Sequence, residues 1–228
     1  MRDESALLGV LGGTFNPPHF GHARAALETR DALGLGGVLW LPSGQHPFKP
    51  SATLAPLADR LDMTAALIGD TPGFVVCDLE ARHPGIGYTV PILETLTREH
   101  PGRELVFLLG GDILTEIHKW YRWQELLDHA HLAVLTRPGH PPDPQQCPAL
   151  PALVAESLPA GVPLQRRPGG RHQVVFVTVT GLDISSRAIR ALVASGRDPG
   201  YLTHERVIGI MNSRQLYRHD PGKSAAGL

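Results

Sequence analysis

The sequence is poor in cysteine, in aromatic residues and in any excess of charge of one sign, and it has no long hydrophobic run. Its two cysteines, Cys77 and Cys147, form neither a disulfide framework nor a metal quartet, so they predict a reducing, cytoplasmic compartment. With 21 Lys and Arg against 22 Asp and Glu, the formal charge is −1, which argues against a nucleic-acid partner. No apolar run approaches the roughly 20 residues that cross a bilayer, and the start has no secretory signal pattern. We therefore expect no membrane association.

Apolar residues are plentiful enough for one packed domain. The 228 residues are 42% hydrophobic and 19% charged, which excludes disorder throughout and suits a single α/β domain over residues 1–228. Nine prolines fall between residues 138 and 172. Because proline lacks the donor that a strand needs and resists helix interiors, this stretch predicts a surface insertion, with a helical turn near residues 152–157. A lid or an oligomer contact is the alternative, and the oligomeric state stays open.

Short apolar runs alternate with helix-length amphipathic stretches. The runs expected to form strands are residues 7–13, 37–43, 74–80, 104–112, 131–138 and 174–180. Helices are expected at residues 21–33, 56–68, 89–100, 185–195 and 203–217. This alternation predicts a doubly wound parallel sheet with right-handed crossovers. Because ligands of such sheets bind beyond the carboxyl ends of the strands, functional residues should follow each strand directly.

The stretch after the first expected strand, residues 12–22, reads Gly-Gly-Thr-Phe-Asn-Pro-Pro-His-Phe-Gly-His. Gly12 and Gly13 allow the backbone to turn sharply beside a ligand. His19 and His22 fall three residues apart at the start of a helix, near its positive end. Together with backbone donors they suit phosphate oxygens. The alternatives are two surface histidines or half of a zinc site, for which no further ligands have supporting spacing.

Other charged residues follow later strands. Asp112 comes just after the fourth and could accept the hydroxyls of a ribose, or it could cap a helix. Lys49 lies in the loop after the second strand, where a lysine is most often solvated. Ser185 or Ser186 can cap the helix after the last strand, and Arg187 and Arg190 lie three apart on one face of it, which also suits an ordinary capped helix with two solvated arginines.

The chain resembles the nicotinate-nucleotide adenylyltransferases of the His-x-Gly-His nucleotidyltransferase superfamily. Residues 12–22 are similar to the superfamily's first motif, and Ile-Ser-Ser-Arg-Ala-Ile-Arg at residues 184–190 is similar to its second. Gly-Tyr-Thr at 87–89, Gly-Gly-Asp at 110–112, Trp-Tyr at 120–121 and Arg-Pro-Gly at 137–139 resemble further family motifs. The sequence departs from the family at Asn16, where Asp is usual, and at Arg187, where the second motif has Thr.

The resemblance implies a Rossmann-like nucleotidyltransferase fold with a C-terminal helical segment at about 185–218. It implies that ATP and nicotinate mononucleotide give nicotinate adenine dinucleotide (deamido-NAD) and pyrophosphate, in NAD biosynthesis. The implied catalytic residues are His19, His22, Lys49 and Arg190. The implied ATP-binding residues are Gly12, Gly13, Thr14, Phe15, Gly110, Asp112, Ile184, Ser185, Ser186 and Arg187. Those implied for the mononucleotide are Thr89, Trp120, Tyr121 and Arg137, although aromatic residues at such spacing are most often core, as Trp123 is expected to be. Mg²⁺ is expected to arrive on ATP, with no metal site on the protein.

Several rival functions remain. The nearest is the same reaction with nicotinamide mononucleotide, or a dual-specific enzyme, because the acid and the amide differ by one charge and one donor. A phosphopantetheine adenylyltransferase is disfavoured by the Trp120–Tyr121 pair. A non-catalytic nucleotide sensor is disfavoured by the presence of His19, His22 and Arg190, and a zinc hydrolase by the lack of further ligands.

Overall fold

The computed structural model describes residues 6–44, 54–138, 143, 145–155, 157–158, 164 and 171–218. Its six-stranded sheet consists of β1 (Leu7–Gly13), β2 (Gly37–Pro42), β3 (Phe74–Val76), β4 (Glu104–Gly110), β5 (His131–Thr136) and β6 (Val174–Thr178). The strand order is β3-β2-β1-β4-β5-β6, and every neighbouring pair is parallel. The predicted doubly wound parallel sheet is confirmed. Among the described residues, no helix has the length and apolarity needed to cross a bilayer.

The central strands form because continuous apolar runs suit a sheet that is covered on both faces. All six residues of β2 are buried, and Val10 of β1 and Val106 of β4 have no exposed surface. The helices cover the sheet as two layers, each closing one hydrophobic cluster. One layer contains α1 (Phe20–Leu33), α2 (Leu57–Ile68), α7 (Ser186–Ala194) and α8 (Glu205–Ser213). The other contains α3 (Leu79–Arg82), α4 (Thr89–Glu99), α5 (Leu126–His129), α6 (Leu150–Ala155) and the short 3₁₀ helices η1 (Gly111–Thr115), η2 (Ile117–Lys119) and η3 (Trp123–Glu125).

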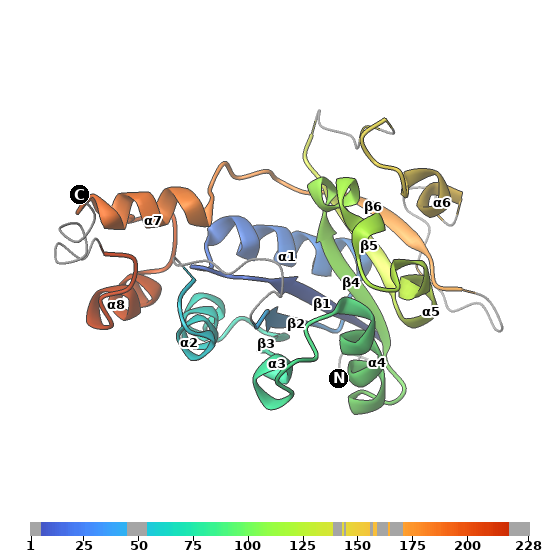
Figure 1. The fold of residues 1–228 in the computed structure, drawn as a ribbon, viewed down its shortest axis with the longest axis horizontal. Helices are drawn as coiled ribbons and strands as arrows, with labels where there is room; N and C mark the ends of the chain where they lie inside the picture. Colours follow the sequence, from blue (N-terminus) through green and yellow to red (C-terminus); the bar gives the residue numbers. More distant parts are fainter. Residues whose placement is uncertain are drawn as a thin grey trace, which may run out of the picture.

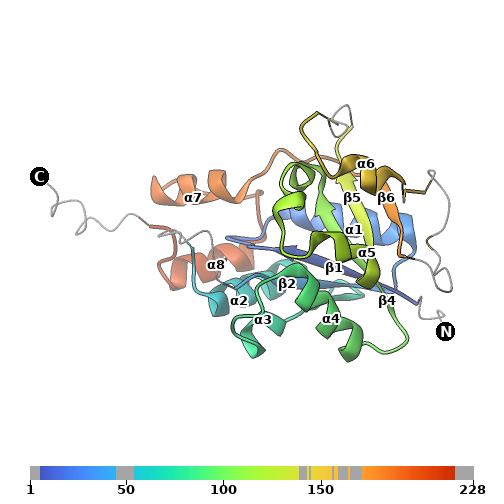
Figure 2. The same cartoon turned by 45° about the vertical axis from the view of Figure 1, so that its right-hand side comes forward.

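The winding of the chain reverses at β1. From β1 the chain runs outward through β2 to β3, then crosses back to β4 on the other side of β1 and runs outward again to β6. The carboxyl ends of β1 and β4, at Gly13 and Gly110, therefore flank the topological switch point where such sheets bind ligands. Figures 1 and 2 show α7 and α8 side by side at one end of the molecule.

Several predicted elements were too long, the third strand and the last helix by the most residues. The third strand ends at Val76 and not at residue 80, because Leu79 turns into α3 and is completely buried there. The last helix covers Glu205–Ser213 and not residues 203–217. Gln215 and Tyr217, with φ angles of 53° and 63°, leave the helical region after it. In the proline-rich insertion the helix is α6, two residues earlier than expected, while residues 139–142 and 165–170 lie outside the described part.

Candidate active site

The loop from β1 to α1, residues 14–19, is anchored by a buried aromatic ring. Phe15 has a φ of 46°, in the left-handed region that side-chain-bearing residues rarely adopt. Its ring is 2% exposed and packs against the rings of Trp40 and His22, with centroid distances of 5.4 and 5.2 Å. A Cβ at Gly13 would lie 3.0 Å from the Phe15 ring, so glycine is needed where the strand ends. The buried ring thus holds a sharp turn at the carboxyl end of β1.

The structure brings His19 and His22 together as a stacked pair. Their ring centroids lie 3.7 Å apart, and Nδ1 of His22 accepts a hydrogen bond from the His19 N–H (3.2 Å). Since Nδ1 is an acceptor, a neutral His22 carries its proton on Nε2 and can donate from there. Nδ1 of His19 is buried with no hydrogen-bond partner among the described residues. A Cβ at Gly21 would lie 3.0 Å from the His19 ring, a tight contact that favours glycine directly before His22.

Burial keeps both imidazoles neutral in the free protein. It lowers the pKa of His19 to about 4. It lowers the pKa of His22 to about 3, and the neighbouring His19 adds to that shift. A phosphate anion beside the pair would favour the charged forms and raise both pKa values. The pair can therefore gain positive charge as an anionic ligand arrives.

The same shifts predict how stability depends on pH. Unfolded histidines bind protons below about pH 6.5, while the folded pair stays neutral down to about pH 4, so the unfolded state binds more protons in that window. Stability is therefore fully present above pH 6.5 and is lost as the pH falls. We expect the free energy of unfolding, from urea titrations at about pH 7, 6 and 5, to fall more steeply for the wild type than for His22→Asn. Equal pH dependence in the two proteins would contradict this assignment.

Side chains from the C-terminal helices hold the loop in place. Three of them donate to three successive loop carbonyls: Arg190 to Asn16 (2.6 Å), Ser186 to Pro17 (2.7 Å) and Thr203 to Pro18 (2.9 Å). The N–H of Phe20, at the start of α1, donates to the Leu202 carbonyl (3.1 Å). Ser186 and Arg190, which the second motif assigned to the triphosphate, therefore also support the first motif.

Asn16 links the loop to two further segments, a role that the sequence analysis missed. Its Oδ1 accepts hydrogen bonds from the Ala55 N–H (3.0 Å) and the Tyr217 hydroxyl (2.7 Å). Burial raises the pKa of Tyr217, so the hydroxyl stays protonated and able to donate. The one signal in the sequence was the replacement of the usual Asp by Asn, which keeps the acceptor without adding a charge.

Arg60 of α2 is a second residue that the sequence analysis missed. It is 1% exposed, and its guanidinium donates to the carbonyls of Thr14 (2.8 Å), Ser43 (2.5 Å) and Ala55 (3.0 Å). Nearby, a carboxylate oxygen of the buried Glu80 accepts from the Gly44 N–H (2.7 Å). The buried side chains of Arg60 and Glu80 thus fix the backbone just after the carboxyl ends of β1 and β2.

On the β4 side of the switch point, Asp112 folds back over Gly110. A Cβ at Gly110 would displace the Asp112 carboxylate from its present position, so glycine allows the two to lie this close. The prediction that Asp112 might cap a helix is wrong, because the residue before η1 is Gly110 and no side chain caps it. Asp112 is exposed, and its carboxylate accepts no hydrogen bond from the described residues. It is free to meet a ligand.

An aromatic pair joins the segment that contains Thr89 to the segment that contains Tyr121. Thr89 is the first residue of α4, directly after Tyr88, whose ring lies 4.9 Å from that of Tyr121. Tyr121 is 54% exposed. Trp120 instead packs edge-on against Phe107 of β4, at 6.3 Å between centroids, and is partly buried against the core. Tyr121 is thus the exposed aromatic side chain of the pair, with the Arg122 guanidinium 5.9 Å from its ring centroid, and Tyr88 is a neighbour that the sequence analysis did not select.

The remaining predicted residues lie as follows. Lys49 is outside the described residues. Arg137 and Arg187 are exposed, and the aliphatic part of Arg137 covers Gly181. Of the two serines expected as possible caps, Ser185 caps α7 by accepting from the Ala188 N–H (3.1 Å), and Ile184 beside it is partly buried. Among the described residues, no three His, Cys, Asp or Glu side chains form a group that could hold a metal ion.

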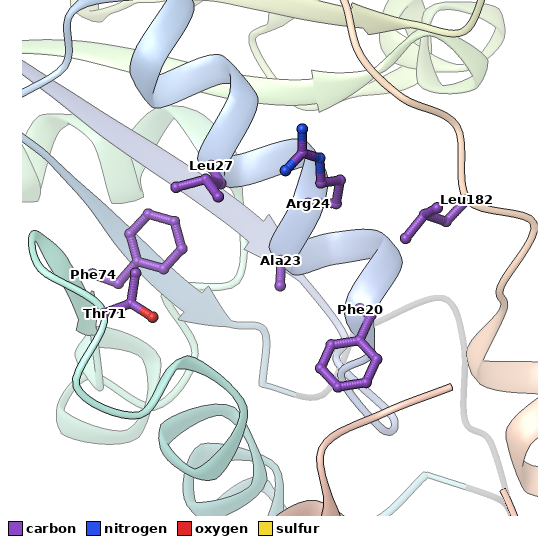
Figure 3. Close-up of a pocket in the computed structure, with 7 residues that line it drawn as sticks. All are labelled: Phe20, Ala23, Arg24, Leu27, Thr71, Phe74 and Leu182. Carbon is purple, nitrogen blue, oxygen red and sulfur yellow. The ribbon is translucent and has the colours of Figure 1, made fainter. Parts of the chain in front are cut away.

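An apolar pocket of about 260 Å³ lies along α1 (Figure 3). Phe20, Ala23, Arg24 and Leu27 line it from α1, facing Thr71 and Phe74 on one side and Leu182 on the other. None of its lining residues belongs to the predicted site.

Comparison with known proteins agrees with this arrangement. The family described as Cytidylyltransferase-like matches residues 10–192. The chain is 40% identical over 216 residues to the probable nicotinate-nucleotide adenylyltransferase of Aeromonas hydrophila, covering 92% of this chain and 97% of that protein. The chain belongs to the nicotinate-nucleotide adenylyltransferase family. A relative of the same name from Syntrophotalea carbinolica is also 40% identical, over 214 residues, with 92% and 97% covered.

Solved structures support the fold of this adenylyltransferase family member. The nicotinic acid mononucleotide adenylyltransferase of Plasmodium falciparum complexed with NaAD superposes with a TM-score of 0.70 at 17% identity, covering 92% of this chain and 97% of that one. A putative nicotinate-nucleotide adenylyltransferase of Vibrio parahaemolyticus gives a TM-score of 0.61 at 18% identity, covering 94% and 96%. The expected Rossmann-like nucleotidyltransferase fold is confirmed.

Proposed function

We propose that this protein joins ATP to nicotinate mononucleotide, giving nicotinate adenine dinucleotide and pyrophosphate in NAD biosynthesis. The observation that carries the proposal is the stacked, neutral His19–His22 pair at the start of α1, beside the switch point of the sheet. It occurs in a chain that is 40% identical to relatives named for this reaction.

The chemistry needs no covalent intermediate on the protein. The phosphate of the mononucleotide is already ionised and attacks the α-phosphorus of ATP in line with the departing pyrophosphate. The protein then contributes by positioning the reactants and stabilising the charge that develops. We assign this stabilisation to His19 and His22, whose neutral rings donate to phosphate oxygens, and to the positive charge of Arg190.

The two nucleotides would lie on either side of this pair. Asp112, with its uncommitted carboxylate, suits the ribose hydroxyls of ATP. Thr89 and Tyr121 suit the pyridine carboxylate and ring, since a flat aromatic face stacks well on a heterocycle. Lys49 and Arg187 are proposed for the triphosphate, and Trp120 and Arg137 for the mononucleotide, from the resemblance of their motifs.

Magnesium is proposed to enter with ATP. Mg²⁺ keeps several waters and is commonly bound through substrate phosphates with few protein ligands. There it would neutralise charge on the leaving pyrophosphate. We also propose that the protein works in the cytoplasm, where its two free, buried cysteines stay reduced.

The test is pyrophosphate release from ATP and Mg²⁺ with nicotinate mononucleotide and its amide side by side. We expect kcat/KM to favour the acid by about tenfold or more, because a site that pairs with a carboxylate loses a charge-assisted contact with the amide. Equal rates would indicate a dual-specific enzyme, and faster release with the amide would reverse the substrate assignment. No release with either would leave a nucleotide-binding sensor.

A further inference from the structure

We infer that Arg60 is a positioning residue that fixes the direction of the Thr14–Phe15 peptide, so that the Phe15 N–H is presented to a phosphate group of ATP. This inference rests on the proposed function, since it takes ATP as the ligand of the β1–α1 loop. Arg60 itself stays behind the loop and touches no reacting atom.

The contacts of Arg60 join three separate segments. Its Nη1 donates to the Thr14 carbonyl (2.8 Å) after β1 and to the Ser43 carbonyl (2.5 Å) after β2, and its Nε donates to the Ala55 carbonyl (3.0 Å) ahead of α2. The planar guanidinium can serve several acceptors at once because its donors are held in a rigid fork. A buried cation that binds only backbone carbonyls in this way sets the path of the main chain.

The position of the Thr14 carbonyl dictates where the next N–H points. The Thr14–Phe15 bond is not among the cis peptides of the described chain, and in a planar trans peptide the C=O and N–H point in opposite directions. With the Thr14 oxygen turned inward to Arg60, the Phe15 N–H is turned to the other side of the loop. This N–H donates no hydrogen bond within the described part of the chain.

Few other donors remain in the loop. Pro17 and Pro18 have no N–H, the His19 N–H donates to His22, and the Phe20 N–H donates to the Leu202 carbonyl. The Phe15 N–H is therefore one of the donors still available to an anion after β1. Outward-facing backbone N–H groups in a turn of this kind form phosphate sites in other folds.

The backbone conformation of Phe15 is unfavourable and needs support from its surroundings. Its φ of 46° persists only where the surroundings over-determine it. The buried ring secures the side chain against Trp40 and His22, while Arg60 secures the peptide that precedes it. Without Arg60 the peptide can flip, which would turn a carbonyl oxygen toward the phosphates and repel them.

Arg60→Lys tests the inference, because lysine keeps the charge but replaces the fork by one ammonium group. We expect the Kd for ATP to rise about tenfold, by weakening of a hydrogen bond to a charged group, while the Kd for adenosine, which has no phosphates, is unchanged. The KM for the mononucleotide should change little.

Met63→Ala is the matched control, since Met63 is a fully buried residue of the same helix that packs in the core. It should lower the Tm and leave the ATP-to-adenosine Kd ratio as in the wild type. Equal weakening of ATP and adenosine by Arg60→Lys, or none, would overturn the inference.

A second measurement needs no variant. Thr14–Phe15 is the one Thr-Phe pair in the sequence, so ¹³C-carbonyl threonine and ¹⁵N-phenylalanine labelling selects the signal of this peptide alone. We expect its amide proton to move downfield on addition of ATP or inorganic pyrophosphate and to stay in place with adenosine. An unmoved amide at saturating ATP would contradict the inference even if Arg60→Lys does not fold.

These binding measurements separate the inference from the proposed function. If neither mononucleotide releases pyrophosphate but the ATP-to-adenosine ratio responds to Arg60→Lys, the proposed reaction is wrong and the role of Arg60 stands. If pyrophosphate release is normal in the wild type and the ATP-to-adenosine Kd ratio does not respond to Arg60→Lys, the proposed reaction stands and the role of Arg60 is wrong.

Discussion

We expect His22→Ala to lower kcat by about 10²-fold to 10³-fold, the range seen when one preorganised donor to a developing charge is removed from an enzyme. In the structure, Nδ1 of His22 is occupied by the His19 N–H, which leaves Nε2–H as the donor for a phosphate oxygen. Alanine removes that donor and the partner of the His19 N–H together. The measurement is pyrophosphate release at saturating ATP and mononucleotide.

His22→Asn separates these two effects. The Oδ1 of the shorter amide can still accept from the His19 N–H, in the position of the third-residue acceptor of a capping box, but it does not reach as far as Nε2. We expect its Tm to stay nearer the wild type than that of the alanine variant, with the same loss of kcat. Near-normal turnover in either folded variant would remove His22 from the stabilisation of charge.

Arg190→Ala should lower kcat/KM for ATP by about 10²-fold, through loss of a charge-assisted contact and of support for the loop. Nη1 of Arg190 donates to the Asn16 carbonyl (2.6 Å), and no carboxylate among the described residues pairs with it. Its positive charge therefore lies against the loop that precedes His19 with no carboxylate in the described part of the chain to neutralise it. The change should appear in the KM for ATP and in kcat, with the KM for the mononucleotide little altered.

Arg197→Ala is the control for charge on the same part of the chain. Arg197 is exposed beyond the end of α7, where its Nε donates to the Ser195 hydroxyl (3.1 Å). We expect its kcat/KM to match the wild type. If both arginine variants lost activity equally, the summed positive electrostatic potential of this part of the surface, and not the position of Arg190, would account for the effect.

The sequence predicted best those elements whose formation depends on one local feature, a continuous apolar run. β1, β4 and β5 follow from continuous apolar runs, and their centres were placed correctly. The end of β3 was misplaced because Cys77 and Leu79 continue its apolar pattern, although Leu79 is buried by α3 and not by the sheet. The 3₁₀ helices around Asp112 and Trp120 were not predicted, since segments of three to five residues carry too little periodicity.

The same distinction applies to the candidate site. His19, His22 and Asp112 were found because their residue types directly follow strands, and the switch point gathers such positions. Arg60 and Tyr217 were missed because they bind acceptors 46 and 201 positions away in the sequence. The acceptor of Arg60 is a backbone carbonyl, which every residue has, so no residue pattern marks the contact.

The contacts that hold the loop also bear on how the protein is made. The carbonyls of Asn16, Pro17 and Pro18 accept from residues 174, 169 and 185 positions later in the chain. A nascent chain can complete its sheet when β6 emerges from the ribosome, but these carbonyls then still face water. Closures over such distances are the slow part of folding. The loop therefore gains its full support only after α7 and Thr203 have been synthesised, and a copy interrupted before α7 carries the first motif without the support that shapes it.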